Sequence, residues 1–427
     1  MKKFICALFA AIALCAFAFG GCSFMGNGAD GKDGQDLNIY DIYEATNAAR
    51  AERGEEQLSF LDFIREYLKY DFEYKEDDLQ AQINRSLLSA VAIFPGFRYP
   101  GTRDLLYAAG SGVIVDIDKA AGDAYILTNS HVVIDFDAYP NTPTEIRVML
   151  YGNDDVYDEN NVNYIKLKPT DIVTYSISYD LALLKVTDSE VIKNSDARAA
   201  VFAESEDVYA GQKVYTVGNP AGSGIAVTTG IISKESEFVA IDFAVGTSAE
   251  NTYRAMRTDA AANSGNSGGP LFDSSGRILG IINSKDASNE NMSYALCGSY
   301  VKRLWRLMSD GYLATSGSYG IRRAVFPGVY TYTTKSSYDN QTNLTVLRDN
   351  VTIKSSQDAN LKMGDVIKHI KIVDGFGKTV DELDITRFYN VDDVLISARE
   401  GCKVIYTVAR GEETLNVECK PVFQDFV

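Results

Sequence analysis

The sequence predicts a mainly β protein, with a short helical region before the strands and a mixed α+β region after them. From about Ser86 onward, short segments rich in β-branched and aromatic residues follow one another between turn residues, without a long helical pattern among them. Many short strands at this spacing are typical of a β-sandwich or a β-barrel. The length of 427 residues is enough for roughly two or three domains.

The composition excludes several classes of function. Hydrophobic residues make up 46% of the chain and charged residues 23%, so a mainly disordered chain is excluded. Acidic residues outnumber basic ones by 58 to 41, and a chain with this negative charge is not expected to bind nucleic acid. With two histidines, six cysteines and no Cys-x-x-Cys pair, we expect no zinc framework or other metal site.

The first 21 residues have the pattern of an export signal. Two lysines precede an apolar run that ends at Phe19, which is too short and wrongly flanked for a stable membrane span. The following Gly20-Gly21-Cys22 resembles a bacterial lipobox, although Phe19 stands where that motif usually has Leu. The resemblance implies that Cys22 is acylated and anchors the protein to the bacterial membrane, outside the cytoplasm. An ordinary secretory signal is the alternative.

Two short regions follow the signal. Residues 22–36 are rich in Gly and Asp and lack apolar periodicity, which predicts a flexible tether. Over residues 37–72, apolar residues recur at three- and four-residue spacing on both sides of Gly54. This pattern predicts a helical hairpin, which we interpret as a spacer or docking element.

The strand-rich domain is predicted over residues 86–315, and a helix over 300–308 is expected to end it. A third region, residues 325–427, has predicted strands and one helix, near 391–399. The strands predicted in these two regions cover residues 91–94, 112–115, 124–127, 146–150, 181–186, 214–217, 230–233, 329–332, 344–347 and 404–408.

Three segments of the strand-rich domain carry the residue types of acyl transfer to serine. His131 follows one predicted strand, Asp180 precedes another, and Ser267 lies among glycines. A serine hydroxyl needs a base within hydrogen-bond reach, and imidazole has a suitable pKa. A carboxylate on the other ring nitrogen fixes the tautomer, while glycines near the nucleophile let the amides of Gly265 and Ser267 converge on an oxyanion.

Each of these segments alone has an ordinary structural explanation. A Gly/Ser/Asn cluster is usually a surface loop, a lone histidine is usually a core residue, and an aspartate is common at the start of a strand. Their joint occurrence in the order His, Asp, Ser favours catalysis.

The segments are similar to those of trypsin-like serine proteases, and in particular to the HtrA (Deg) branch. The similarity lies in Asn-Ser-His131-Val-Val, Asp180-Leu-Ala-Leu-Leu and Asn-Ser-Gly-Asn-Ser267-Gly-Gly-Pro-Leu, and it is supported by Gly218-Asn-Pro-Ala-Gly222. It covers about residues 86–310 and implies two six-stranded β-barrels with the active site between them. It further implies His131 as general base, Asp180 as its orienting carboxylate, Ser267 as nucleophile, and Gly265 with Ser267 as oxyanion amides.

The resemblance also implies a specificity pocket. In this family the residue six positions before the nucleophile forms the pocket floor, which is Ala261 here, and Ile281, Ile282 and Asn283 are expected to form a wall. Without an acid at the floor, cleavage after Arg or Lys is disfavoured. We expect a preference for small or aliphatic residues.

The third region resembles a PDZ domain. Leu361-Lys-Met-Gly364-Asp365-Val-Ile is similar to the Leu-x-x-Gly-Asp-x-Ile turn of those domains. The resemblance implies an α+β domain that binds extended peptide ends by strand addition, with a purely structural cap as the alternative. We interpret His369 as a structural residue.

Three cysteines remain outside the signal and its junction: Cys297, Cys402 and Cys419. This is an odd number for an exported chain. Cys402 and Cys419 flank a predicted hairpin and could lie close together, although free buried thiols are as plausible.

These patterns together predict a membrane-anchored extracytoplasmic serine endopeptidase that needs no metal or organic cofactor. The resemblance implies unfolded or misassembled exported polypeptides as substrates, and a trimer as a possible homo-oligomer. One alternative is a peptide-binding scaffold lipoprotein whose triad does not assemble. Another is a processing protease of narrow specificity.

Overall fold

The computed structural model describes residues 39–53, 55, 79–135, 142–153, 163–203, 208–241, 251–285, 292–309 and 321–426. The chain divides into two compact units, residues 1–75 and 76–427. Within the first unit, α2 (Ile39–Glu52) is the first of the two helices predicted for residues 37–72. The second predicted helix, the signal with Cys22 and the tether fall outside the described residues. No helix in the described ranges has the length and apolar character to cross a membrane.

The second unit begins with an antiparallel sheet of eight strands in the order β6-β5-β1-β3-β4-β8-β7, with β2 paired to β1. Helix α4 (Leu79–Leu87) precedes the sheet, α5 (Ser130–Val133) lies between β4 and β5, and α6 (Glu190–Lys193) follows β8. The strands are β1 (Ala90–Phe97), β2 (Leu106–Tyr107), β3 (Gly110–Asp118), β4 (Asp123–Thr128), β5 (Glu145–Leu150), β6 (Ile165–Leu167), β7 (Ile172–Ser176) and β8 (Leu181–Val186).

A second sheet of seven strands has the order β13-β10-β11-β12-β15-β14-β9, and an additional β13–β14 pairing closes it into a barrel. Helix α7 (Gly298–Ser309) follows this sheet, which confirms the helix predicted at 300–308. The strands are β9 (Val201–Phe202), β10 (Lys213–Gly218), β11 (Ala226–Ile241), β12 (Asn251–Thr258), β13 (Pro270–Asp273), β14 (Arg277–Lys285) and β15 (Ser293–Cys297).

The two sheets contain eight and seven strands, where the resemblance implied six each. The difference includes β2 and β9, two-residue strands that each pair with a single neighbour. Such short edge pairings add few apolar positions, so the sequence pattern does not reveal them.

Side chains on successive positions of the first sheet point into two different cores, as the two-residue period of a strand requires. On β3, Val113 packs in a core shared with the second sheet, and Ile114 packs in a core inside the first. On β4, Leu127 joins the shared core and Ile126 the inner one. The shared core holds the two sheets together on either side of the site described below.

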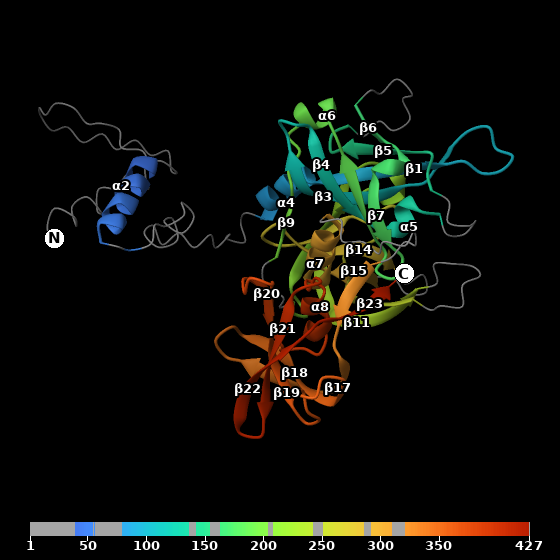
Figure 1. Cartoon of the computed structure of the whole chain (residues 1–427). Helices are drawn as coiled ribbons and strands as arrows, with labels where there is room; N and C mark the ends of the chain where they lie inside the picture. Colours follow the sequence, from blue (N-terminus) through green and yellow to red (C-terminus); the bar gives the residue numbers. More distant parts are fainter. Residues whose placement is uncertain are drawn as a thin grey trace, which may run out of the picture. The chain divides into compact units, whose positions relative to one another are not determined.

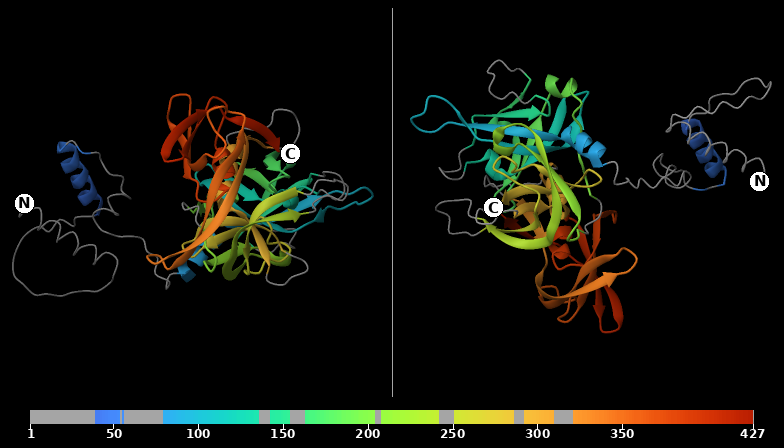
Figure 2. Two further views of the ribbon diagram at one scale, coloured as in Figure 1. Left: turned by 90° about the horizontal axis from the view of Figure 1, so that it is seen from below. Right: turned by 180° about the vertical axis from the view of Figure 1, so that it is seen from behind.

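The last part of the second unit, residues 321–426, combines strands with one helix and is called the C-terminal domain below. It contains a six-stranded sheet in the order β17-β18-β19-β21-β22 with β20 on β19, and a two-stranded sheet of β16 and β23 (Figures 1 and 2, orange to red). Its elements are β16 (Ile321–Val325), β17 (Gly328–Asp339), β18 (Leu344–Ser356), β19 (Val366–Val373), β20 (Thr379–Asp384), α8 (Asn390–Leu395), β21 (Lys403–Arg410), β22 (Glu413–Cys419) and β23 (Val422–Phe426).

Helix α8 is shorter than the 391–399 predicted from the sequence. The amides of Ser397 and Ala398 bind the carbonyls of Val394 and Leu395, three residues back, so the α-helical pattern tightens into turns. The Leu-x-x-Gly-Asp turn has Gly364 at φ +91°, and the buried Asp365 accepts two hydrogen bonds of 2.7 Å from Arg410.

Ion pairs connect the C-terminal domain to the second barrel. Arg254 on β12 pairs with Asp393 on α8. Arg303 on α7 pairs with Asp381 on β20 at 2.7 Å, and Glu235 on β11 accepts a hydrogen bond of 2.8 Å from Arg387. The three cysteines outside the signal are buried and free, so Cys402 and Cys419 form no disulfide.

Candidate active site

His131 is held at the end of β4 by a single helical turn. Strand β4 ends at Thr128, and α5 begins two residues later. The side chain of Asn129 donates a hydrogen bond of 2.8 Å to the main-chain oxygen of Asp180, which fixes the turn against the start of β8. This anchoring brings the imidazole Nδ1 of His131 to 2.7 Å from Oδ2 of Asp180.

Asp180 lies in a tight turn directly before β8, with φ +44°. Few non-glycine residues adopt this left-handed conformation, and aspartate tolerates it better than most. The Asp180 side chain has no exposed surface. A carboxylate in this position needs donors around it, because an unpaired buried charge is strongly destabilising.

The carboxylate of Asp180 receives four hydrogen bonds, two on each oxygen. Oδ1 accepts from the hydroxyl of Ser130 at 2.7 Å and from the amide of His131 at 3.0 Å. Oδ2 accepts from Nδ1 of His131 and from the side-chain amide of Asn283. Since an ionised carboxylate offers about four lone-pair sites, every acceptor position is filled.

The pKa of His131 is raised above its ordinary value. Burial acts to lower this pKa, but the charge of Asp180 and its hydrogen bond to Nδ1 raise it by more. The imidazolium form is therefore stabilised by a fixed carboxylate, as a general base requires when it takes a proton.

Ser267 lies in the loop between β12 and β13 of the second barrel. Its main-chain oxygen accepts a hydrogen bond of 2.9 Å from the amide of Ser111, on β3 of the first barrel. Its hydroxyl donates to the main-chain oxygen of Asn283 at 3.0 Å. Because a hydroxyl has one proton, Ser267 does not donate to His131 in this conformation. Both side chains are partly exposed, whereas Asp180 is buried.

The loop before Ser267 contains a glycine that no other residue could replace and two main-chain amides with no acceptor among the described residues. Gly265 has φ +96°, and a Cβ added there would lie 2.2 Å from the main-chain oxygen of Asn219, so only glycine fits. Among the described residues, no group accepts a hydrogen bond from the amide of Gly265 or of Ser267. Two uncommitted amides beside a nucleophile could bind a developing oxyanion.

Ser111 holds this loop, a role that the sequence did not predict. Its hydroxyl donates to the main-chain oxygen of Gly265 at 2.6 Å and accepts from the amide of Asn219 at 2.8 Å. Asn219 belongs to the Gly-Asn-Pro-Ala-Gly segment noted in the sequence, which was a signal for its importance. Ser111 offered no comparable signal, because a serine between glycines is common in turns.

The four residues predicted for the specificity pocket occupy different environments. Ala261 is exposed, and its main-chain oxygen accepts from the hydroxyl of Thr228 at 2.9 Å. Ile281 and Ile282 are buried in the shared core. The side chain of Asn283 contacts Asp180 and the hydroxyl of Tyr253, contacts that the sequence did not suggest. No group of His, Cys, Asp and Glu side chains within the described ranges could hold a metal ion.

The two sheets and the residues between them define a trypsin-like peptidase domain. A family model described as a trypsin-like peptidase domain matches residues 110–281. Within this class the chain is similar to HtrA proteases. It is 31% identical over 312 residues to the serine protease Do-like HtrA of Bacillus subtilis, an alignment that covers 71% of this chain and 61% of the relative.

Two further proteins resemble the chain. The periplasmic serine endoprotease DegP of Escherichia coli is 30% identical over 224 residues, which is 52% of this chain and 40% of DegP. A crystal structure of the serine endoprotease from Yersinia pestis matches with a TM-score of 0.41 and 21% identity, over 81% of this chain and 98% of that one. The chain thus spans less than two thirds of the length of the Bacillus and Escherichia relatives.

Proposed function

We propose that this protein is a serine endopeptidase that hydrolyses peptide bonds through an acyl-enzyme on Ser267. The observation that carries the proposal is the hydrogen-bonded His131–Asp180 pair, with a fully satisfied carboxylate, beside the Ser267 loop. The partial exposure of His131 and Ser267 supports it, because a substrate must reach both groups.

In the proposed reaction, the hydroxyl of Ser267 turns from Asn283 toward Nε2 of His131 and attacks the scissile carbonyl carbon. His131 takes the hydroxyl proton, and Asp180 stabilises the resulting imidazolium. The amides of Gly265 and Ser267 bind the oxyanion. His131 then gives the proton to the leaving amine, and a water molecule, activated by His131, releases the acyl group.

We propose unfolded or misassembled polypeptides outside the cytoplasm as substrates. The Bacillus and Escherichia relatives are named as serine proteases, and the latter as periplasmic, which supports this setting. Ala261 lacks a charge that could pair with a basic side chain, so we expect cleavage after small or aliphatic residues. Acylated Cys22 would hold the enzyme at the membrane, and Cys22→Ala should release it into the medium.

We also propose that the C-terminal domain binds extended peptide ends. Strand β17 is at the edge of its sheet, and most of its side chains are exposed. An edge strand with unpaired main-chain groups can accept an added peptide strand. A homo-oligomer, with a trimer as the first form to test, belongs to the same proposal.

A fluorophosphonate probe tests the central proposal. We expect Ser267 of the full-length protein to be labelled and unfolded casein to be degraded, with both activities lost in Ser267→Ala. A scaffold with an unassembled triad is the second candidate, because the Ser267 hydroxyl donates to Asn283. That candidate predicts no labelling of the wild-type protein, which would overturn the proposal. Proteomes of wild-type and Ser267→Ala cells would separate a broad protease from a processing protease with one substrate.

A further inference from the structure

Asn283 contacts both the nucleophile and the acid of the proposed triad. It lies on β14, and its main-chain oxygen accepts the hydrogen bond from the Ser267 hydroxyl. Its side-chain amide donates to Oδ2 of Asp180, the same oxygen that binds His131. Asn283 is 1% exposed, so these contacts lie away from water. Hydrogen bonds in such surroundings are electrostatically stronger than in water.

The chemistry of the partners fixes the orientation of the Asn283 amide. The carboxylate of Asp180 can only accept, so the NH₂ group of Asn283 must face it. The amide oxygen then faces the opposite way, where the hydroxyl of Tyr253 donates to it. If the amide were flipped, two oxygens would face each other at Asp180, which is unfavourable. The carboxylate of Asp180 therefore selects the orientation of the amide, and the hydroxyl of Tyr253 supplies the donor that this orientation requires at the amide oxygen.

We propose that Asn283 and Tyr253 are positioning residues for the catalytic aspartate, an inference that rests on the proposed function. Asn283 holds the carboxylate of Asp180 in the orientation in which Oδ2 accepts a hydrogen bond from Nδ1 of His131. Tyr253 acts through Asn283, by donating a hydrogen bond to its amide oxygen. Without that hydroxyl the amide oxygen would be buried without a partner, a state that costs enough free energy for the side chain to turn away from Asp180.

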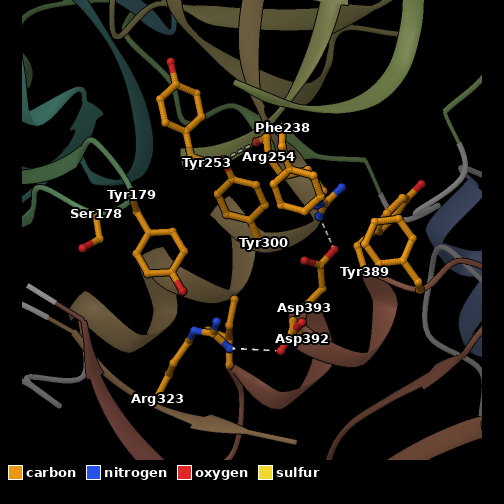
Figure 3. A pocket seen from close by; sticks show the side chains of 12 residues that line it. Ser178, Tyr179, Phe238, Tyr253, Arg254, Tyr300, Arg323, Tyr389, Asp392 and Asp393 are labelled. Carbon is orange, nitrogen blue, oxygen red and sulfur yellow. Dashed lines mark hydrogen bonds and ion pairs between the residues drawn. The ribbon is translucent and has the colours of Figure 1, made fainter. Parts of the chain in front are cut away.

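Tyr253 reaches this position from a cavity of about 320 Å³ between the second barrel and α8 (Figure 3). The same cavity is lined by Ser178 and Tyr179, which directly precede Asp180 in the chain. The turn that leads into Asp180 and the side chain of Tyr253 therefore border the same cavity. Tyr300 lines the cavity too, but its hydroxyl donates to the main-chain oxygen of Arg254 at 2.8 Å.

Tyr253→Phe and Tyr300→Phe form a matched pair for the test. Each removes one hydroxyl from the same cavity and keeps the ring. The full-length protein would be assayed on a fluorogenic casein, with kcat expressed per site titrated by the fluorophosphonate. We expect Tyr253→Phe to lower kcat about 3- to 10-fold with KM unchanged, the effect of one hydrogen bond. Tyr300→Phe should stay within about twofold of wild type, since the bond that it removes does not lead to Asp180.

A double-mutant cycle separates positioning from general destabilisation. Asn283→Leu, which removes both side-chain bonds, should lower kcat by about 10- to 100-fold, as expected for a bond to a charged group. In the Asn283→Leu background, Tyr253→Phe should have no further effect on kcat, because the hydrogen bond through which we propose that Tyr253 acts is gone. The acid limb of the kcat/KM profile should move to higher pH in Asn283→Leu, since a carboxylate with one donor fewer attracts the imidazolium more strongly.

Equal kcat values for Tyr253→Phe and Tyr300→Phe would overturn the inference, as would additive effects of Tyr253→Phe and Asn283→Leu. Either result leaves the proposed function standing as long as the wild-type protein is labelled at Ser267. Absence of that labelling would instead remove the proposed function itself, before any variant is compared.

Discussion

The two histidines of this protein form the same chemical pair in two regions of the molecule. In the peptidase domain, Nδ1 of His131 lies 2.7 Å from Asp180, and in the C-terminal domain Nδ1 of His369 lies 2.8 Å from Asp384. The aspartates differ in their surroundings: the side chain of Asp180 is 0% exposed and that of Asp384 is 81% exposed. Nearly equal distances therefore correspond to very different interactions, because water screens the second pair and not the first.

The comparison indicates what makes a histidine–aspartate pair a candidate site. Asp180 has all four acceptor positions filled by protein donors, and a serine among glycines lies beside the pair. His369 has a second carboxylate, Glu382, at 3.6 Å from Nε2, so its other nitrogen faces an acid. The surroundings, and not the pair, separate the candidate general base His131 from the pair in the C-terminal domain.

The largest expected effect is on activity. His131→Ala should lower kcat by at least about 10⁴-fold, because Ser267 loses its base. His369→Ala should leave kcat within about twofold, as expected for loss of a surface pair. Casein cleavage per milligram of folded protein measures both. A comparable loss in the two variants would show that the C-terminal pair takes part in catalysis.

A glycine in each region gives the next contrast. Gly265 and Gly364 have similar φ values, +96° and +91°, but a Cβ at Gly265 would meet Asn219, while nothing lies within 4 Å of one at Gly364. Gly265→Ala should lower kcat by about 10²- to 10³-fold through a displaced oxyanion amide. Gly364→Ala should cost only the backbone strain, about 1–2 kcal/mol of unfolding free energy, and no activity. Unchanged kcat in Gly265→Ala would exclude the oxyanion role.

The pH dependence follows from the raised pKa of His131. Only the neutral imidazole can accept the Ser267 proton, so activity should appear above the ordinary histidine pKa of about 6.5. Because the folded pKa exceeds the unfolded one, the pair stabilises the fold fully below that pH and loses this contribution as the pH rises through the folded pKa.

Proton NMR titration of Ser267→Ala can follow both imidazoles, since the chain has only two histidines. We expect Asp180→Asn to lower the pKa of His131, because the carboxylate whose charge and hydrogen bond outweigh the effect of burial is removed. Asp384→Asn serves as the control and should leave the His131 titration where it is. No change in Asp180→Asn would mean that the carboxylate does not set this pKa.

The smallest expected effect is on stability and concerns the pair of His369 and Asp384. Asp384→Asn should lower the free energy of unfolding by less than about 1 kcal/mol, the usual limit for a surface ion pair. Urea unfolding near pH 6 measures it, and raising the salt concentration should reduce the difference further. A loss of several kcal/mol would mean that His369 supports the fold of the C-terminal domain.

Much of the fold could be predicted from the sequence, because short apolar segments rich in β-forming residues mark β3, β4 and β8, and apolar residues recur at helical spacing along α7. The end of α8 could not, since the apolar pattern continues through turns that bond three residues back. The two-residue strands β2 and β9 are too short to have a pattern.

In the site, His131, Asp180 and Ser267 stood out because their short motifs carry local information. The contacts of Asn283 and Ser111 did not, because they join residues 103 and 154 positions apart. Asparagine and serine are common in turns, so their type alone indicates no role. Only the folded chain reveals that β14 and β3 deliver these side chains to the triad.

The bonds from Ser111 have a consequence for how activity arises during folding. The loop that carries the nucleophile belongs to one barrel, yet it is shaped by a strand of the other. If the chain were cut between β8 and β10, one fragment would contain Ser111 and the other the loop with Ser267. We expect reactivity toward fluorophosphonate only when the two fragments are mixed and assemble. If the proposed function holds, a newly made chain should gain this reactivity only once its second sheet has folded against its first.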